Sequence, residues 1–358
     1  FTVPKRYSKL QFINAGAQGA VVSAYDSITK ICVAIKKLDR PMQYPSSALR
    51  TIREFALLTS VKHPNVVRIL SVFTPQKKRE CFKDVYLVME LMTHNLDEVR
   101  KKKRLDHKTL SFFFYQILCG VNHLHRQGIV HRDLKPSNLA INKVDQVKVL
   151  DFGLARLFTP TIADQMTKYV VTRYYRAPEL IFELPYNEKV DVWSIGCIFA
   201  EMITGNVLFP VNDLIIMTER SVAMLSEQDA RYPCFTVDAA HQYFSRENSR
   251  QITPKSIEEI LPDHNFIEAT EEPEKNMTAS NARRLIARML AIDPKERYST
   301  EQALHDPYVK HWFQEAEVHL LDNSHCIKSI SNQINAPLSN KGSLIFDEVK
   351  LIESSHDV

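Results

Sequence analysis

The sequence predicts an α+β fold of two lobes, a small β-rich lobe with one helix followed by a larger and mainly helical lobe. The first 90 residues alternate polar and β-branched residues and contain only one segment of helical spacing. After His94 the balance reverses, and apolar residues recur mainly at the spacing of helices. Hydrophobic residues make up 44% and charged residues 25% of the 358 residues, which is the composition of a globular protein with a substantial core.

The small lobe is predicted to begin with a β-meander over 7–38, in which AQG at 17–19 makes a turn and VAIKKL closes the third run. Residues 46–63 then have helical spacing, with Ser46 or Ser47 as the N-cap. The segments 65–73 and 84–90, NVVRILSVF and DVYLVME, return to strand character.

The large lobe is predicted to contain apolar helices at 110–125, 190–204 and 279–290, with short strands at 139–142 and 147–151. Residues 245–277 are polar and irregular, which predicts a surface insertion. Residues 343–352 regain helical spacing and predict a terminal helix that docks on the body. We therefore expect an N-lobe over 1–92, a C-lobe over 93–322 and a C-terminal extension over 323–358 that packs back on the body.

Composition narrows the expected partners. The net charge of +4 is too balanced to demand nucleic acid. No segment approaches the ~18 consecutive apolar residues of a membrane span, and the first residues lack the apolar run of a signal peptide. The six cysteines are scattered without the spacing of a disulfide framework or a zinc site. We expect a soluble cytoplasmic protein, and because residue 1 is Phe we expect the chain to begin inside a longer polypeptide.

The segment 131–138, HRDLKPSN, carries side chains suited to phosphoryl transfer onto a hydroxyl group. Asp133 can accept the hydroxyl proton, Lys135 can neutralise the charge of the moving phosphoryl group, and Asn138 can bind Mg²⁺. The five residue types His, Arg, Asp, Lys and Asn occur at these fixed offsets by chance with a frequency of ~10⁻⁴ over a chain of this length. A polar turn with helix caps is the weaker interpretation.

Two glycine-containing motifs fit the same chemistry. Asp151 of the DFG sequence follows a predicted strand and can hold a metal that bridges phosphates, while Gly153 lets the backbone turn sharply. The turn that contains Gly16 and Gly19 can bring backbone N–H groups close to phosphates. Taken alone, that turn is no more specific than an ordinary hairpin turn.

A lysine and a glutamate complete the set. Lys36 in the VAIK strand, paired with Glu54 of the following helix, would be held rigidly enough to grip phosphate oxygens. The alternative is that Glu54 pairs only with Arg50, one helical turn earlier.

Together these residues resemble the protein-kinase signature, and the resemblance covers essentially the whole chain. More narrowly, the chain resembles mitogen-activated protein (MAP) kinases, and most closely the stress-activated c-Jun N-terminal kinase group with its divergent nematode-like members. The residues behind this are VFTPQK (72–77), DVYLVMELM (84–92), HRDLKPSN (131–138), DFGLAR (151–156), YVVTRYYRAPE (169–179) and the insertion before ARRLIARMLAIDPKER. The resemblance implies the bilobal protein-kinase fold with a regulatory helix in the N-lobe, ATP and Mg²⁺ as cofactors, and transfer of the γ-phosphate to Ser or Thr that precedes Pro.

The resemblance also assigns roles to single residues. Met89 is the expected gatekeeper, Glu90 to Met92 the adenine-contacting hinge, and Ala140 with Leu150 the floor of the pocket. The expected catalytic residues are Asp133, Lys135, Asn138, Lys36 and Glu54, and the expected metal ligands are Asn138 and Asp151. The expected nucleotide-binding residues are Ile13, Asn14, Gly16, Gln18, Gly19, Val21, Ala34, Lys36, Met89, Glu90, Met92, Asn95, Ala140 and Leu150.

An activation switch is implied at Thr167-Lys168-Tyr169, where the family carries a doubly phosphorylated T-x-Y. Each phosphate adds nearly two negative charges and needs arginines around it. The candidates on the resemblance are Arg50, Arg53, Arg132 and Arg156 for Thr167, and Arg173 and Arg176 for Tyr169. Glu179 of APE and Arg297 are expected to form a buried structural pair.

The chain also departs from the family pattern. Asn14 replaces the first glycine of the glycine-rich loop, residues 182–183 and 211–212 lack the usual glycines of the substrate groove, and Lys168 is an unusual middle residue. The acidic docking patch is thin, with Glu315, Glu317 and Asp322 as candidates beside Gln314 and His319. The basic run 100–104 is expected to be a solvated face, with a nuclear-import patch as the alternative.

The partners implied by the resemblance are protein substrates with Ser/Thr-Pro sites, an upstream dual-specificity MAP kinase kinase, and docking-motif scaffolds and phosphatases. We expect a monomer that binds neither nucleic acid nor membrane and that has nuclear entry as an option. The competing hypothesis is a pseudokinase scaffold, motivated by Asn14 and the groove changes. Such scaffolds typically lose the residues equivalent to Lys36, Asp133, Asn138 or Asp151, and this chain keeps all four.

Overall fold

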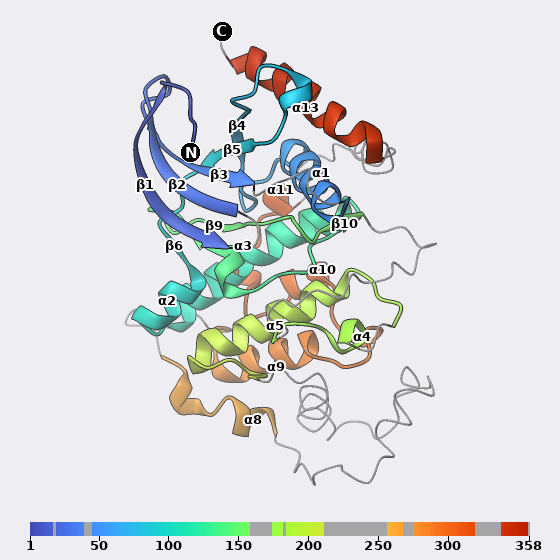
Figure 1. Cartoon of the computed structure of the whole chain (residues 1–358). Helices are drawn as coiled ribbons and strands as arrows, with labels where there is room; N and C mark the ends of the chain where they lie inside the picture. The colour runs from blue at the N-terminus through green and yellow to red at the C-terminus, as the bar shows by residue number, and fades with distance from the viewer. Residues whose placement is uncertain are drawn as a thin grey trace. The chain divides into compact units, whose positions relative to one another are not determined.

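The computed structural model describes residues 1–16, 19–38, 45–157, 174–181, 184–210, 256–267, 275–318 and 338–356. The chain forms two compact units: unit 1 is Phe1–His94, Ala140–Leu157 and Leu321–Val358, and unit 2 is Asn95–Leu139 and Phe158–Leu320. The predicted α+β class is confirmed, because unit 1 contains an antiparallel sheet and unit 2 is mainly helical (Figure 1). The segment boundaries at 92/93 and 322/323 remain predictions.

The sheet of unit 1 has five antiparallel strands in the order β1-β2-β3-β5-β4. Their bounds are β1 Tyr7–Gly16, β2 Gly19–Asp26, β3 Cys32–Leu38, β4 Ile69–Phe73 and β5 Val85–Glu90. The aromatic rings of Phe73 and Tyr86 stack with centroids 4.8 Å apart, and Tyr7 stacks on Phe73 at 5.7 Å. These rings join Val22, Ile35 and their neighbours in an apolar cluster that fixes the central strand β3.

Two long helices belong to the same unit. Helix α1 (Pro45–Ser60) buries Ile52, Phe55 and Leu57. Helix α13 (Leu338–His356) packs against α1 and β4 (Figure 1). The ring of Phe346 meets Phe82 edge to face with centroids 5.4 Å apart, and Val349 is fully buried. Helix α13 therefore packs on the elements of unit 1, and it is longer than the apolar spacing at 343–352 indicates.

The short strands β8 (Leu139–Ile141) and β9 (Val147–Val149) are tied to the chain before β4. The amide group of Asn65 donates to the carbonyl oxygen of Val147 at 2.9 Å, and Val66 forms a parallel bridge with Val149. This explains why β4 begins at Ile69 although strand-like spacing starts at Asn65. The backbone of residues 65–67 bonds to β9, so it takes no part in the main sheet.

Unit 2 is built on long helices. The main ones are α2 Leu96–Lys102, α3 His107–Arg126, α5 Lys189–Thr204 and α9 Ala279–Met289. Shorter elements are β6 His94–Asn95 at the boundary with unit 1, β7 Ile129–Val130, α4 Pro178–Ile181, α8 Ile257–Ile260, α10 Thr300–Leu304 and α11 Glu315–Val318. Single 3₁₀ turns lie at Pro136–Asn138, Asp263–Asn265 and Lys310–Trp312.

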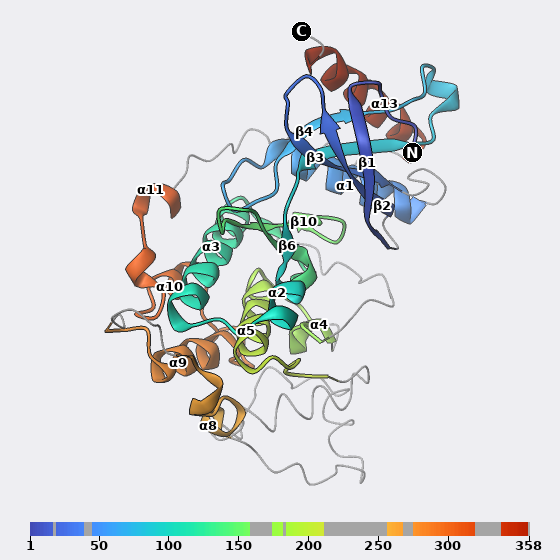
Figure 2. The ribbon, with the colours of Figure 1, turned by 90° about the vertical axis from the view of Figure 1, so that its left-hand side faces the viewer.

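Helix α5 lies between α3 and α9 in both views (Figures 1 and 2). A Cβ atom on Gly196 of α5 would lie 2.9 Å from the Leu290 side chain, so the glycine permits close packing against the end of α9. Helix α5 ends at Gly205, whose φ of 77° suits glycine. Asn95 and Asp106 cap α2 and α3 by accepting from backbone N–H groups of the first turn.

The prediction of an irregular surface insertion over 245–277 holds only in part for the described residues 256–267, because most of them are exposed or half-buried but they include a short helix. Ser256 and Glu259 form a capping box that starts α8, and Leu261 directly after the helix is fully buried. Arg283 of α9 donates from Nε to the Leu261 carbonyl oxygen at 2.7 Å. The polar sequence gave no sign of α8, because the segment is held by one buried side chain, Leu261, and by a hydrogen bond from Arg283, which lies far away in the chain. In the described part of the chain, no helix is long and apolar enough to cross a membrane.

Candidate active site

In unit 1, strand β3 and helix α1 bring the predicted lysine and glutamate together. Lys36 Nζ lies 2.5 Å from Glu54 Oε1, and the two side chains are 11% and 3% exposed. In the register of the sheet, Lys36 is the partner of Val21 on β2 and of Leu87 on β5. The structure therefore contains the predicted ion pair. The alternative, in which Glu54 pairs only with Arg50, is wrong.

The charge of Lys36 is stabilised by two carboxylates. Burial alone would lower the pKa of Lys36, but Glu54 and Asp151 outweigh burial and hold that pKa above its ordinary value. The Oδ1 atom of Asp151 lies 3.9 Å from Lys36 Nζ. Burial raises the pKa of Glu54, and the Lys36 ammonium opposes that rise. The lysine therefore stays cationic, as a group that binds phosphate oxygens must be.

The turn after β9 differs in one respect from the sequence prediction. The positive φ lies at Asp151, at 64°, and not at Gly153. The backbone N–H of Gly153 donates to Asp151 Oδ1 at 3.2 Å, while Phe152 is fully buried. Aspartate tolerates this backbone conformation when its side chain bonds locally, which explains why glycine is not required at the turn.

The glycine-rich hairpin joins β1 and β2. Gly16 and Gly19 are register partners, and Gly19 has a φ of 126°, a conformation that favours glycine. Asn14 lies within β1 and its side chain accepts from the Ala15 N–H at 2.8 Å. Asn14 has no positive φ, so the loss of glycine there imposes no backbone strain. Gln18 lies outside the described residues.

The other expected nucleotide-binding residues lie in unit 1, except Asn95. Ala34 of β3 is the register partner of Met89 on β5, and Ala34 and Ala140 are both buried. Unit 1 also contains the expected nucleotide-binding residues Ile13, Val21, Glu90, Met92 and Leu150. In unit 2, Asn95 accepts from the Glu98 N–H as the cap of α2. Their roles in nucleotide binding remain predictions.

Lys148 is a residue that sequence reasoning missed. Its Nζ lies 3.0 Å from Glu90 Oε2, so this cation fixes the first residue of the expected hinge. The lysine is buried among Val147 and Val149, and a charged residue inside such an apolar strand was the available signal.

In unit 2, residues 131–138 form a compact polar cluster. Lys135 Nζ lies 2.9 Å from Asp133 Oδ2. The Asn138 amide donates to the Asp133 carbonyl oxygen at 2.8 Å and to its Oδ2 at 3.1 Å. The structure thus brings Asp133, Lys135 and Asn138 together, with the Asp133 carboxylate as the shared acceptor.

Asp191 in the first turn of α5 anchors this cluster, and the sequence analysis did not single it out. It accepts from the backbone N–H groups of His131 and Arg132, each at 2.8 Å, and pairs with His125 Nε2 at 2.9 Å. Burial alone would raise the pKa of Asp191, but His125 and these donors hold it below its ordinary value. The Arg132 backbone has a φ of 69°, so the anchor fixes an unusual turn directly before Asp133.

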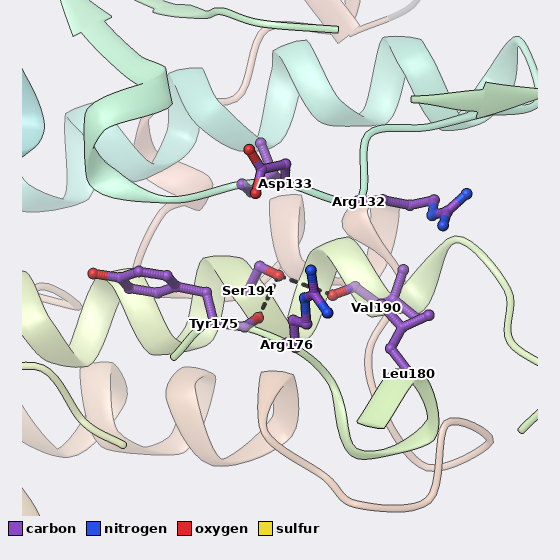
Figure 3. Close-up of a pocket in the computed structure, with 8 residues that line it drawn as sticks. Arg132, Asp133, Tyr175, Arg176, Leu180, Val190 and Ser194 are labelled. Carbon is purple, nitrogen blue, oxygen red and sulfur yellow. Dashed lines mark hydrogen bonds between the residues drawn. The ribbon is translucent and has the colours of Figure 1, made fainter. Parts of the chain in front are cut away.

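A pocket opens beside Asp133 (Figure 3). Its lining residues come from the catalytic segment, the segment before α4 and helix α5. They are Arg132, Asp133, Leu134, Tyr175, Arg176, Leu180, Val190 and Ser194. The pocket therefore combines one carboxylate, two guanidinium groups and an apolar wall.

Five of the six arginines predicted to hold phosphates lie in the described part of the chain. Arg132 stacks its guanidinium over the Tyr186 ring at 5.4 Å, and its buried Nη1 has no hydrogen-bond acceptor among the residues the structure describes. Arg50, Arg53 and Arg156 belong to unit 1, whereas Arg132 and Arg176 belong to unit 2. The residues outside the described part are Thr167, Lys168, Tyr169, Arg173, the groove residues 182–183 and 211–212, His319 and Asp322. Convergence of the arginines remains a prediction.

The expected structural pair is confirmed. Arg297 is fully buried and places Nη1 and Nη2 2.6 and 3.1 Å from the two Glu179 oxygens. Arg297 also donates to the carbonyl oxygens of Lys189, Ala291 and Ile292, so each hydrogen-bonding face of the guanidinium is used.

One surface interpretation changes. Arg100 is not part of a solvated face, because its side chain is 17% exposed and its Nε lies 3.0 Å from Glu201 Oε1. Glu315 and Glu317, two candidates for the acidic docking patch, are both exposed, and Glu317 also accepts from the Tyr115 hydroxyl at 3.0 Å.

Comparison with known proteins agrees with this geometry. A model of the protein kinase domain matches residues 7–309. GLH-binding kinase 1 of Caenorhabditis elegans is 49% identical over 358 residues, which are 100% of this chain and 91% of the relative. Stress-activated protein kinase jnk-1 of Caenorhabditis elegans is 48% identical over 317 residues, 88% of this chain and 67% of the relative. Stress-activated protein kinase JNK of Drosophila melanogaster is 45% identical over 318 residues, 89% of this chain and 84% of the relative.

The geometry and the relatives therefore agree with the resemblance found in the sequence, and they favour an enzyme over a scaffold. The chain belongs to the protein kinase family, as an ATP-dependent serine/threonine kinase of the stress-activated MAP kinase type.

Proposed function

We propose that this kinase transfers the γ-phosphate of ATP to Ser or Thr residues that precede Pro. The pocket beside Asp133 is the observation that supports this specificity (Figure 3). Leu180 and Val190 give it an apolar wall that suits a pyrrolidine ring. Proline also brings no backbone N–H, so its burial there leaves no donor without a partner.

The chain's own residues supply the chemistry of transfer. Asp133 accepts the proton of the substrate hydroxyl as the oxygen attacks phosphorus, and Lys135 neutralises charge next to it. Asn138 holds the Asp133 carboxylate in place through its amide group. Lys36, fixed by Glu54, orients the phosphates.

The proposed magnesium ligands fit the donor chemistry of the metal. The amide nitrogen of Asn138 is committed to Asp133, and this leaves the amide oxygen as the atom that can bind a cation. Asp151 offers a carboxylate near Lys36. Oxygen donors of these two kinds are what Mg²⁺ prefers, and the bound ion would neutralise charge on the phosphates of ATP.

Activation is proposed to require phosphorylation of both Thr167 and Tyr169 by an upstream dual-specificity MAP kinase kinase. The buried Nη1 of Arg132, which has no acceptor among the described residues, supports an anionic partner for that arginine. Docking-motif scaffolds and phosphatases are further proposed partners, and the kinase is proposed to act as a cytoplasmic monomer that can enter the nucleus.

The test compares two peptides that differ only in the residue after the phosphoacceptor, Ser-Pro and Ser-Ala, with ATP and Mg²⁺. We expect transfer to Ser-Pro to exceed transfer to Ser-Ala at least about tenfold, which corresponds to ~1.4 kcal/mol of binding in the pocket. We also expect the protein phosphorylated at Thr167 and Tyr169 to be far more active than Thr167→Ala and Tyr169→Phe proteins. Equal rates for the two peptides contradict the specificity, and equal rates with and without phosphorylation contradict the switch.

A further inference from the structure

We propose that Arg100 is a positioning residue for the substrate pocket, acting through Glu201 and Tyr175. This inference deepens the proposed function, because it assumes that the pocket beside Asp133 binds the residue that follows the phosphoacceptor. Arg100 does not line the pocket itself. It belongs to the basic run 100–104, which the sequence alone presents as a solvated surface.

A chain of short polar contacts connects Arg100 with the pocket. The guanidinium Nε lies 3.0 Å from Glu201 Oε1, and the Glu201 side chain is fully buried. The other carboxylate oxygen, Oε2, accepts from the Tyr175 hydroxyl at 2.6 Å. One oxygen of Glu201 therefore forms an ion pair with the arginine, without the alignment of a hydrogen bond, and the other accepts a hydrogen bond from the tyrosine.

Tyr175 is fixed at its other end as well. Its carbonyl oxygen accepts from Ser194 Oγ at 2.7 Å, and Ser194 and Tyr175 both line the pocket (Figure 3). Two hydrogen bonds, from the Tyr175 hydroxyl to Glu201 and from Ser194 to the Tyr175 carbonyl oxygen, therefore fix the position of the tyrosine next to the apolar wall. A loss of either bond would let the pocket change shape.

The cation is needed because the carboxylate is buried. Burial raises the pKa of Glu201, and Arg100 and the Tyr175 hydroxyl oppose that rise. Without the guanidinium, the carboxyl group either takes up a proton or turns toward water, and in either case its bond to Tyr175 weakens. The same environment raises the pKa of Tyr175, so its hydroxyl remains the donor.

A lysine could not replace this arginine. Arg100 also donates from Nη1 to the Gly205 carbonyl oxygen at 2.9 Å and pairs through Nη2 with Asp97 at 2.5 Å. One planar group thus hydrogen-bonds to Asp97 of α2 and to Gly205 at the end of α5 and forms an ion pair with Glu201 of α5, a geometry that an ammonium group on a flexible stem does not reproduce.

The experiment measures kcat and KM for the Ser-Pro and Ser-Ala peptides in the full chain, phosphorylated at Thr167 and Tyr169 to the same extent as judged by intact mass. The variants are Arg100→Ala, Arg100→Lys, Tyr175→Phe and the double variant Arg100→Ala/Tyr175→Phe. Lys103→Ala is the matched control, since Lys103 lies in the same basic run and is exposed. Thermal unfolding of every variant separates stability from specificity.

We expect Arg100→Ala to raise KM for the Ser-Pro peptide about tenfold with kcat within about twofold, and to narrow the preference over Ser-Ala. Arg100→Lys should recover only part of the loss, and Lys103→Ala should leave every value unchanged. Tyr175→Phe removes one hydroxyl and should reproduce the KM change, so the proposal can be tested even if Arg100→Ala unfolds. The double variant should lose no more than the worse single variant, because the two residues act through the same carboxylate, that of Glu201.

Two results overturn the proposal. One is an Arg100→Ala protein that has a lower melting temperature but an unchanged KM and peptide preference. The other is a Tyr175→Phe protein with the wild-type KM. A wild-type kinase without any preference for Ser-Pro would instead refute the proposed function on which the inference rests, so the two failures are distinguishable.

Discussion

The anchoring of the catalytic segment by Asp191 gives the sharpest test of how the fold supports the chemistry. The change Asp191→Asn keeps the size of the side chain but replaces one carboxylate oxygen with an NH₂ group. Oδ1 accepts from the Arg132 N–H, whereas Oδ2 accepts from the His131 N–H and pairs with His125. The amide oxygen of asparagine can take the place of one carboxylate oxygen. Its NH₂ group then takes the place of the other and points its N–H donors at groups that are donors themselves.

The expected cost follows from that count. Depending on which site the amide oxygen keeps, one or two hydrogen bonds to a charged acceptor are lost at about 1.5–3 kcal/mol each, so unfolding should become easier by roughly 2–6 kcal/mol. With an unfolding entropy of about 2.1 cal/mol/K per residue, ~1 kcal/mol lowers the melting temperature of a 358-residue protein by about 1.3 °C, which gives a decrease of roughly 3–8 °C. The turn before Asp133 would also relax, and a displacement of about 1 Å at a reacting group costs roughly 10²-fold in kcat.

The assay measures thermal unfolding and steady-state transfer to a Ser-Pro peptide in the same preparation. Asp145→Asn is the matched control, because Asp145 is exposed and has a φ of 55° that asparagine tolerates. The control should change neither quantity. If Asp191→Asn keeps the wild-type melting temperature and a kcat within twofold, the reasoning about this anchor is refuted.

Three further predictions concern buried charges. Glu54→Gln should lower kcat/KM for ATP by roughly 10²-fold because its lysine partner loses a fixed position, and an unchanged ATP titration would contradict this. Glu179→Gln should destabilise the protein by about 3–5 kcal/mol, since Arg297 stays buried without its carboxylate, and an unaltered unfolding temperature would count against that. Burial alone would raise the pKa of Asp26, but Arg6 and local hydrogen bonds hold it at about 2, below the reference value of 3.8. Asp26→Asn should therefore cost about 2 kcal/mol above pH 4, and denaturant titrations should show this gap closing as the pH falls toward 2 rather than staying constant.

Local pattern and motif spacing predicted the parts of the molecule that depend on nearby sequence. The β-meander, the helix after it and the terminal helix follow from apolar periodicity, and the structure contains all of them. The pair between Lys36 and Glu54 was predicted from a strand lysine and a glutamate in the helix that follows. The structure shows the pair as a buried contact between β3 and α1.

The features that were missed depend on contacts between residues far apart in the chain. Asp191 is one acidic residue in an apolar helix, and its role appears only when residues 131 and 132 lie beside it. Arg100 looked like its basic neighbours, yet it alone in that run reaches the buried Glu201. Leu261 anchors an otherwise polar segment, which hydrophobic periodicity could not detect.

Backbone conformation also escaped the sequence. Glycine was expected to make the turn after β9, but the positive φ lies at Asp151, whose side chain accepts from the Gly153 N–H. Asn14 replaces the first glycine of the glycine-rich loop, yet it lies within β1 and has no positive φ. Residue type indicates only which residues tolerate a positive φ. At the turn after β9, the local hydrogen bond of the Asp151 side chain accompanies the positive φ.

The central claim is that Asp133 is the residue that accepts the substrate proton in a kinase switched on by phosphorylation. The most direct measurement is transfer of the γ-phosphate to a Ser-Pro peptide by protein phosphorylated at Thr167 and Tyr169, compared with its Asp133→Ala variant. We predict that the variant binds ATP and unfolds at the wild-type temperature but loses roughly 10²–10⁴-fold in transfer rate. Transfer by the Asp133→Ala protein at a rate close to that of the wild type would contradict the account.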